Sequence, residues 1–195
     1  MLIRTFKILL TSLISATGLL SCISYTSQEA TNTPMPSEWS VRVEAGPDSC
    51  MPLGDEYFTK GIGTGFQNSE LVPRRLDADL GHTYPASNLP EVARLSTDED
   101  AGTLTMSFPH PVRKTFTESV VCDEGWWKFE QKMSDIHMGD GGQLDELINT
   151  VWLATSTDGS LIVHVKVFVI DSSLVLVKRR ENKEGWAKYE SATGR

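Results

Sequence analysis

The sequence predicts an all-β domain with minor α content, built as an antiparallel β-sandwich or a small β-barrel with a C-terminal meander. Two observations predict this class. Several short segments alternate apolar and polar side chains with a period of two, as half-buried strands do. Clusters of Gly, Pro, Asp, Asn and Ser separate those segments, as turns do. Only the segment 134–149 favours a helix, because the apolar residues Leu144, Leu147, Ile148 and Val151 have helical spacing.

The expected strands follow one another through short turns. A first strand is expected where Trp39, Val41 and Val43 alternate with polar residues. In the C-terminal part, Asp158-Gly159 predicts a tight hairpin, and Glu181 to Gly185 predict a further turn. The remaining strands are expected at 92–96, 103–108, 112–122, 126–133, 161–170, 174–180 and 186–189.

The segment 51–91 has no clear period. A loop of about forty residues is long for a compact domain, so this segment is either functional or contains strands that the pattern hides. Gly61, Gly63 and Gly65 lie in it. They resemble a phosphate-binding loop only superficially, because no Lys-Ser/Thr pair and no helical pattern follow them. A bend where two backbones approach closely is the better interpretation.

The first twenty-two residues have the order of an export signal. Arg4 and Lys7 precede an uncharged run from Ile8 to Leu20, which is shorter than the roughly 20 residues that a spanning helix needs. The run closes on Leu19-Leu20-Ser21-Cys22. These four residues resemble the lipobox of bacterial lipoproteins. The alternative is an ordinary signal peptide that is cut elsewhere.

The lipoprotein resemblance implies the organisation of the chain. Residues 1–21 would be removed, and Cys22 would carry a thioether-linked diacylglycerol and an amide-linked acyl chain such as palmitate. Several chains anchor a protein to a lipid bilayer without a spanning segment. Residue Ile23 stands where an Asp would favour the inner membrane, so the resemblance implies the outer membrane, with the domain facing the periplasm. The expected divisions are a lipidated tether, 22–37, and one globular domain, 38–191.

Two cysteines remain if Cys22 carries lipid. We expect Cys50 and Cys122 to form a disulfide bond in an oxidising export compartment, with two buried thiols as the alternative. Loss of the first 21 residues, which contain two basic and no acidic residues, changes the formal net charge from −8 to −10. This acidity disfavours nucleic acid as a partner, because the phosphate backbone repels negative charge.

Trp126 is the candidate contact with a partner. It shares a predicted strand face with Lys128, Glu130 and Lys132, and an exposed Trp among charges often marks a contact surface. Trp127, Phe129 and Met133 are expected on the opposite, core face. A Trp folded under a loop is the alternative interpretation of Trp126.

Three functions follow from these observations. The first is a non-enzymatic binding or assembly module in the envelope with a protein partner, since the sequence contains no known catalytic motif and implies no cofactor. The second is a periplasmic enzyme, with or without a metal ion, that uses either of two acid–histidine groups. The third is an inhibitor of a basic cell-wall hydrolase, favoured by the acidity, the expected disulfide-linked β-fold and the expected tethering of the domain. The two groups of the second hypothesis are Asp77, Asp79 and His82, and Asp135, His137 and Asp140.

Overall fold

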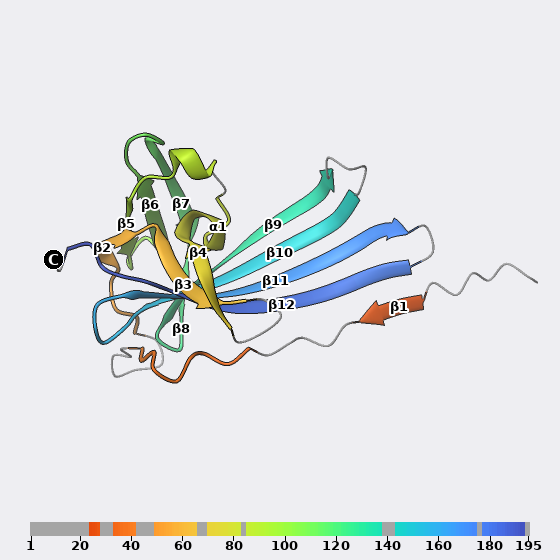
Figure 1. Cartoon of the computed structure of the whole chain (residues 1–195), viewed down its shortest axis with the longest axis horizontal. Coiled ribbons are helices and arrows are strands. Elements are labelled where there is room, and N and C mark those ends of the chain that lie inside the picture. The colour runs from red at the N-terminus through yellow and green to blue at the C-terminus, as the bar shows by residue number, and fades with distance from the viewer. Residues whose placement is uncertain are drawn as a thin grey trace, which may run out of the picture.

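The computed structural model describes residues 24–27, 33–41, 49–65, 70–82, 85–137, 143–174 and 177–193. Their strands form two sheets (Figure 1). The small sheet has the order β2-β5-β6-β7, with β2 (Gly54–Phe58), β5 (Val92–Asp98), β6 (Thr103–Phe108) and β7 (Lys114–Ser119). All neighbouring strands of this sheet are antiparallel.

The large sheet has the order β4-β3-β12-β11-β10-β9-β8, and its neighbouring strands are antiparallel. Strand β1 (Ser24–Ser27) pairs with β12 in parallel. A short helix α1 (Leu76–Asp79) and a 3-10 turn η1 (Ala86–Asn88) connect the sheets. The strands of the large sheet are β3 (Lys60–Thr64), β4 (Leu71–Arg75), β8 (Val121–Asp123), β9 (Trp126–His137), β10 (Gln143–Thr155), β11 (Leu161–Leu174) and β12 (Val177–Tyr189).

One hydrophobic core joins the two sheets. The inner face of the large sheet contributes Trp127, Leu153 and Val163, and the small sheet contributes Leu95 and Met106. These side chains are at most 2% exposed. The predicted fold class is confirmed, and the two open sheets make it a sandwich and not a barrel. The predicted C-terminal meander is confirmed too, since β9 to β12 are consecutive neighbours.

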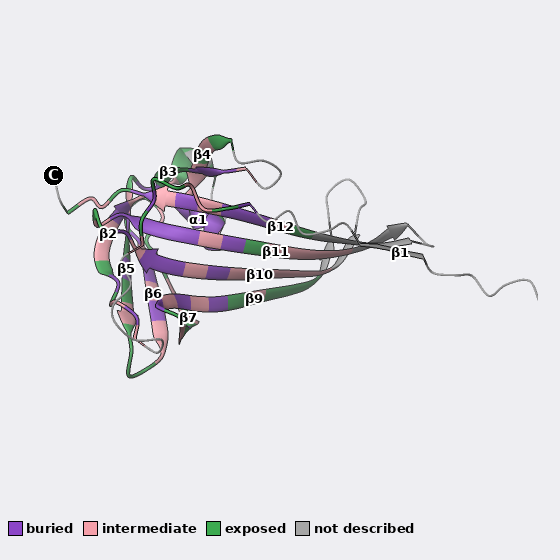
Figure 2. Ribbon diagram, turned by 90° about the horizontal axis from the view of Figure 1, so that it is seen from below, coloured by how far each residue is buried: buried purple, intermediate pink, exposed green. Residues whose placement is uncertain are grey.

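The long strands β9 to β12 extend well beyond the small sheet (Figures 1 and 2). Burial decreases along them in that direction (Figure 2). The alternation of side chains predicted that Met133 lies in the core. This prediction is wrong, because Met133 is 44% exposed. It keeps the face of Trp127 and Phe129, yet it lies past the end of the small sheet that would cover it.

Three expectations about local structure require correction. The segment 134–149, expected as a helix, belongs mostly to β9 and β10, because pairing with a strand on each side overrides its helical spacing. The expected turn at 181–185 lies inside β12, where Gly185 faces Val165 of β11. The segment 51–91 contains β2, β3, β4, α1 and η1, so it does hide strands.

The chain crosses from the small to the large sheet at Thr59, between β2 and β3. The Thr59 hydroxyl donates to the Pro90 carbonyl, and the Thr59 N–H donates to the Glu91 carbonyl over 2.9 Å. In β3, a Cβ on Gly63 would lie 2.2 Å from the Trp186 carbonyl oxygen, and one on Gly61 would lie 2.3 Å from that of Lys188. The predicted close backbone approach at these two glycines is confirmed.

Cys50 and Cys122 form a disulfide bond, as predicted, with their Cα atoms 5.7 Å apart. It links the segment before β2 to strand β8, so it ties the beginning of the domain to the edge of the large sheet. No helix among the described residues is long and apolar enough to cross a membrane.

Residues 33–41, which we call the strap, lie against the large sheet. The Trp186 Nε1–H donates to the Thr33 carbonyl over 2.7 Å, and Val41 forms an isolated bridge with Ser156. Trp39 is only 4% exposed. The expected tether, 22–37, thus includes β1 and the first half of the strap, whereas 1–23 and 28–32 lie outside the described residues.

Candidate functional site

The outer face of the large sheet carries a row of aromatic side chains that plays no part in the core. In the strand register, Lys128 of β9 faces Trp152 of β10, Trp152 faces His164 of β11, and His164 faces Trp186 of β12. Their chain neighbours Trp127, Leu153, Val163 and Ala187 point into the core. Because side chains alternate along a strand, this row points away from the core.

The rings of Trp152, His164 and Trp186, which we call the aromatic row, stack on one another across three strands. The ring centroids of Trp152 and His164 are 4.8 Å apart, and those of His164 and Trp186 are 3.9 Å apart with an interplanar angle of 3°. The ammonium groups of Lys128 and Lys166 lie 5.4 and 5.5 Å from the Trp152 ring centroid, within cation–π range. The imidazole of His164 is therefore held between the two indole rings, one on each side.

Trp126 lies on the same outer face, two residues before Lys128, and joins the aromatic row at its other end. Its ring makes an edge contact with Trp186, with centroids 5.9 Å apart and an interplanar angle of 66°. Like the aromatic row, Trp126 is half-buried. The sequence allowed either an exposed Trp126 or one folded under a loop. The structure shows an intermediate case, in which Trp126 is at the surface but is partly covered by an aromatic neighbour.

A buried carboxylate holds the imidazole of the row. The Glu184 Oε1 atom is 2.5 Å from His164 Nε2 and 3.4 Å from the Lys166 ammonium. Burial lowers the pKa of His164 and outweighs the opposing pull of Glu184. A neutral imidazole at pH 7 then donates its Nε2–H to Glu184, which fixes the ring orientation.

An open cleft lies beside this face, at the Thr59 crossing. We call it the corner cleft. Its volume is about 770 Å³, within the range of ligand sites. The strap, β2, β3, the segment before β5 and the end of β12 all contribute to it. The lining is both apolar and charged, and consists of Glu38, Trp39, Phe58, Thr59, Lys60, Gly61, Ile62, Leu89, Pro90, Glu91, Lys188 and Glu190.

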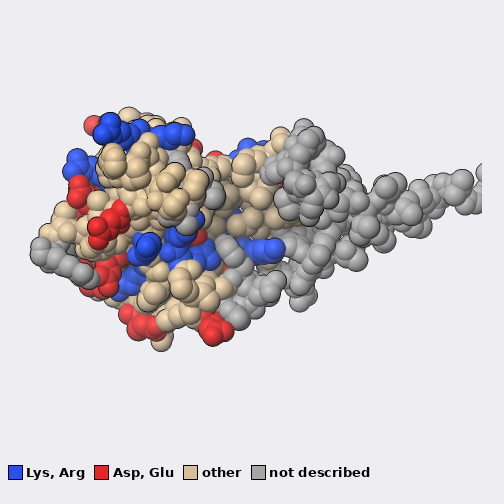
Figure 3. Space-filling view, turned by 45° about the horizontal axis from the view of Figure 1, so that its top comes forward, with Lys and Arg blue, Asp and Glu red and all other residues tan. Residues whose placement is uncertain are grey.

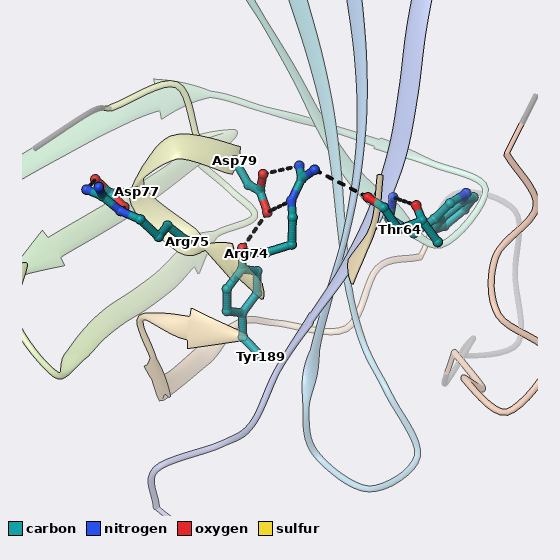
Figure 4. A network of polar contacts seen from close by, with 7 residues as sticks. Thr64, Arg74, Arg75, Asp77, Asp79 and Tyr189 are labelled. Atoms are coloured by element: carbon teal, nitrogen blue, oxygen red, sulfur yellow. Dashed lines mark hydrogen bonds and ion pairs between the residues drawn. The ribbon is translucent and has the colours of Figure 1, made fainter. Parts of the chain in front are cut away.

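In the first predicted acid–histidine group, both carboxylates bind arginine side chains. Arg74 binds Asp79 through two hydrogen bonds, and the Tyr189 hydroxyl donates to the same carboxylate (Figure 4). Arg75 binds Asp77, with Nη2 2.6 Å from Oδ2. Burial, reinforced by Asp79, raises the pKa of Tyr189 well above its ordinary value, so the hydroxyl keeps its proton. Both carboxylates of this group therefore form salt bridges with arginines that lie close to them in the sequence.

His82 does not join these two carboxylates. Its ring stacks on Phe116 with centroids 3.8 Å apart, and its Nε2 atom is 3.7 Å from Glu118 Oε1. Across the described ranges, no three His, Cys, Asp or Glu side chains lie close enough together to hold a metal ion. The side chains of the second predicted group, Asp135, His137 and Asp140, lie outside the described residues.

Charge is mixed over the sandwich. On the face drawn in Figure 3, acidic and basic side chains are interspersed and do not form separate fields. Comparison with known proteins adds no relative: no family model, no curated protein and no solved structure matches this chain.

Proposed function

We propose that this chain is a lipid-anchored envelope protein whose domain is a non-enzymatic binding or assembly module for another envelope protein. The observation that carries the proposal is the outer face around Trp126 and the aromatic row. Large aromatic side chains with a polar edge supply much of the energy of protein–protein contacts. Here three half-buried tryptophans are gathered on the side of the sheet that faces away from the core.

The rigidity of this face favours binding. Strand register fixes Trp152, His164 and Trp186 side by side, and Glu184 holds the imidazole between them. These side chains would lose little further rotamer freedom when a partner covers them. The entropic cost of association is lowered as a result. Lys128 and Lys166 beside the Trp152 ring would form hydrogen bonds or ion pairs at the edge of the contact.

In the part of the chain whose side chains the structure describes, three titratable groups that could support an enzyme have other partners. Asp77 and Asp79 are held by arginines, and His164 is stacked between two indole rings. These contacts favour a binding module over the alternative of a periplasmic enzyme.

The anchor is the second part of the proposal. Cys22 would be acylated and would hold the protein in the bilayer, with the domain in the periplasm at the outer membrane. Each buried methylene of an acyl chain contributes about 0.8 kcal/mol, so several chains suffice for stable anchoring. Cys22→Ser should leave an unprocessed precursor of unchanged length, detected by mass spectrometry. Normal processing of this variant would disprove the anchor.

A single substitution tests the binding surface. Trp126→Ala should reduce capture of the envelope partner at least tenfold, because aromatic contacts at interface centres each contribute about 2 kcal/mol or more. The matched control is Met133→Ala, which removes an exposed apolar side chain from the opposite face of the same strand, β9 (44% exposed). Thermal unfolding should show both variants folded. Equal capture by the Trp126 variant and the wild type would refute the assignment of this surface.

A further inference from the structure

We propose that the corner cleft binds a basic segment of a protein partner, with an apolar side chain against the cleft wall and a Lys or Arg side chain at its rim. This inference goes beyond the proposed function, which assigns a surface around Trp126 and names no ligand chemistry. It rests on three properties of the cleft: an exposed apolar wall, an acidic rim and a preformed shape.

The wall presents apolar surface to solvent. Ile62 of β3 is 49% exposed, one of the few large aliphatic side chains at the described surface to be so open. Phe58 and Leu89, which also line the cleft, are half-buried, and the buried Trp39 of the strap adds to the apolar lining. Covering such surface with an apolar side chain contributes about 25 cal/mol per Å² removed from water. The wall therefore selects an apolar group.

The rim selects a positive group. Glu38, Glu91 and Glu190 line the cleft, against the two ammonium groups of Lys60 and Lys188. Lys188 already has a counter-charge, because its ammonium lies 2.6 Å from Asp158 Oδ2. Glu38 and Glu91 alone therefore outnumber the one remaining ammonium group of the lining, that of Lys60. Phosphate-bearing ligands would be repelled there, whereas a cationic side chain would be attracted.

The cleft is formed before any ligand arrives. The Phe58 N–H donates to the Glu190 carbonyl over 3.0 Å, which joins β2 to the end of β12. Thr59 donates to Pro90 and Glu91, which fixes the opposite wall. The Trp39 N–H donates to the Pro36 carbonyl over 3.0 Å and closes a turn in the strap. The strap, Thr59 and the end of β12 are each held by backbone hydrogen bonds. A ligand can therefore bind with little rearrangement of the cleft.

The experiment uses the full-length chain and three acetylated, amidated pentapeptides with an uncharged fluorophore. Each peptide has leucine, phenylalanine and leucine at positions one, three and five, with lysine, glutamine or glutamate at positions two and four. Fluorescence anisotropy gives the affinities at low ionic strength. A benzoyl-phenylalanine in place of the central phenylalanine then locates the bound peptide by photo-crosslinking and mass spectrometry.

The lysine peptide should bind at least tenfold more tightly than the glutamate peptide, with the glutamine peptide between them, and it should crosslink to 58–62 or 89–91. Glu38→Gln combined with Glu91→Gln should weaken the lysine peptide about threefold to tenfold, as expected for two solvent-exposed ion pairs. The matched control, Glu99→Gln with Asp100→Asn, removes two charges from an exposed turn outside the cleft and should change affinity less than twofold.

A second variant tests the wall without a charge change. Ile62→Thr keeps a β-branched residue at an exposed strand position, so the chain should remain folded while the lysine peptide binds more weakly. Each of four results would overturn the proposal: no binding of the lysine peptide, equal binding of the lysine and glutamate peptides, crosslinks outside the cleft, or a wild-type affinity in the Glu38/Glu91 variant.

Discussion

His164 and Trp186 face each other on β11 and β12 with parallel rings whose centroids are 3.9 Å apart. The contact makes β11 and β12 a rigid support for the surface around Trp126. It also places a titratable ring inside the aromatic row, where its charge state affects the whole face.

The stability of the protein should therefore fall as the pH is lowered below the ordinary imidazole value of 6.5. Burial lowers the pKa of His164 in the folded state, so the unfolded chain binds a proton first. The stabilising contribution of neutral His164 is present above pH 6.5 and is lost below it. His82 acts in the same direction, because burial lowers its pKa too.

Urea unfolding at pH 7.5 and pH 5.5 measures this effect. His164→Gln, which can still donate a hydrogen bond to Glu184, should reduce the difference in unfolding free energy between the two pH values. Gly54→Ala is the control, since it changes no titratable group and its Cβ would have no atom within 4 Å, and it should leave the difference unchanged. A His164 variant with the full wild-type pH dependence would contradict this role of the imidazole.

The close approach at Gly63 predicts a strong effect of a single methyl group. Gly63→Ala would place a Cβ 2.2 Å from the Trp186 carbonyl oxygen, so β3 must move away from β12. We expect a loss of about 1–3 kcal/mol in the free energy of unfolding. Gly54→Ala is the matched control, because its Cβ would have no atom within 4 Å. Equal stabilities of the two variants would show that β3 and β12 are not this close.

The buried ion pair of Arg74 and Asp79 should be much more important for stability than a surface pair. Arg74→Met leaves the Asp79 carboxylate, 4% exposed, without its counter-charge and should cost about 3–5 kcal/mol. Arg94→Met breaks an exposed pair with Glu56 and should cost less than about 1 kcal/mol. Chemical denaturation of both variants gives the comparison. Similar costs would contradict the burial of this network (Figure 4).

The disulfide bond should contribute strongly to stability. Cys50 and Cys122 are separated by 72 residues, and in the chain-entropy model a loop of this length contributes about 4 kcal/mol. The Cys50→Ser, Cys122→Ser double variant should unfold at a markedly lower temperature than the oxidised wild type. Reduced wild type should match the double variant. No difference between oxidised and reduced wild type would mean that the bond is absent in solution.

Local patterns were sufficient to predict the fold class and the strands β5, β6, β7, β9 and β11, and the number of cysteines predicted the disulfide bond. Alternation along Leu161 to Ile170 is a property of the strand itself, so it predicted the strand at 161–170. The helix expected at 134–149 failed because spacing within one segment contains no information about its partners β9 and β11.

The candidate site depends on register, which the sequence determines only through its turns. Asp158-Gly159 placed the turn between β10 and β11, and Trp152 then faces His164. The second half of the aromatic row was missed because Glu181 to Gly185 resemble a turn, although they continue β12 and bring Trp186 to His164. The corner cleft combines the strap, Phe58, Leu89 and Glu190, whose proximity no local pattern reveals.

The most direct test of the central claim is photo-crosslinking from the outer face in the cells that produce the protein. Benzoyl-phenylalanine at Glu130, exposed and two residues beyond Lys128 on the same face, should yield a crosslinked envelope protein. The same substitution at Arg94, exposed on the small sheet, should yield none. Adding Trp126→Ala should abolish the adduct at Glu130. An adduct that persists in that variant, or that forms equally from Arg94, would contradict binding through this face.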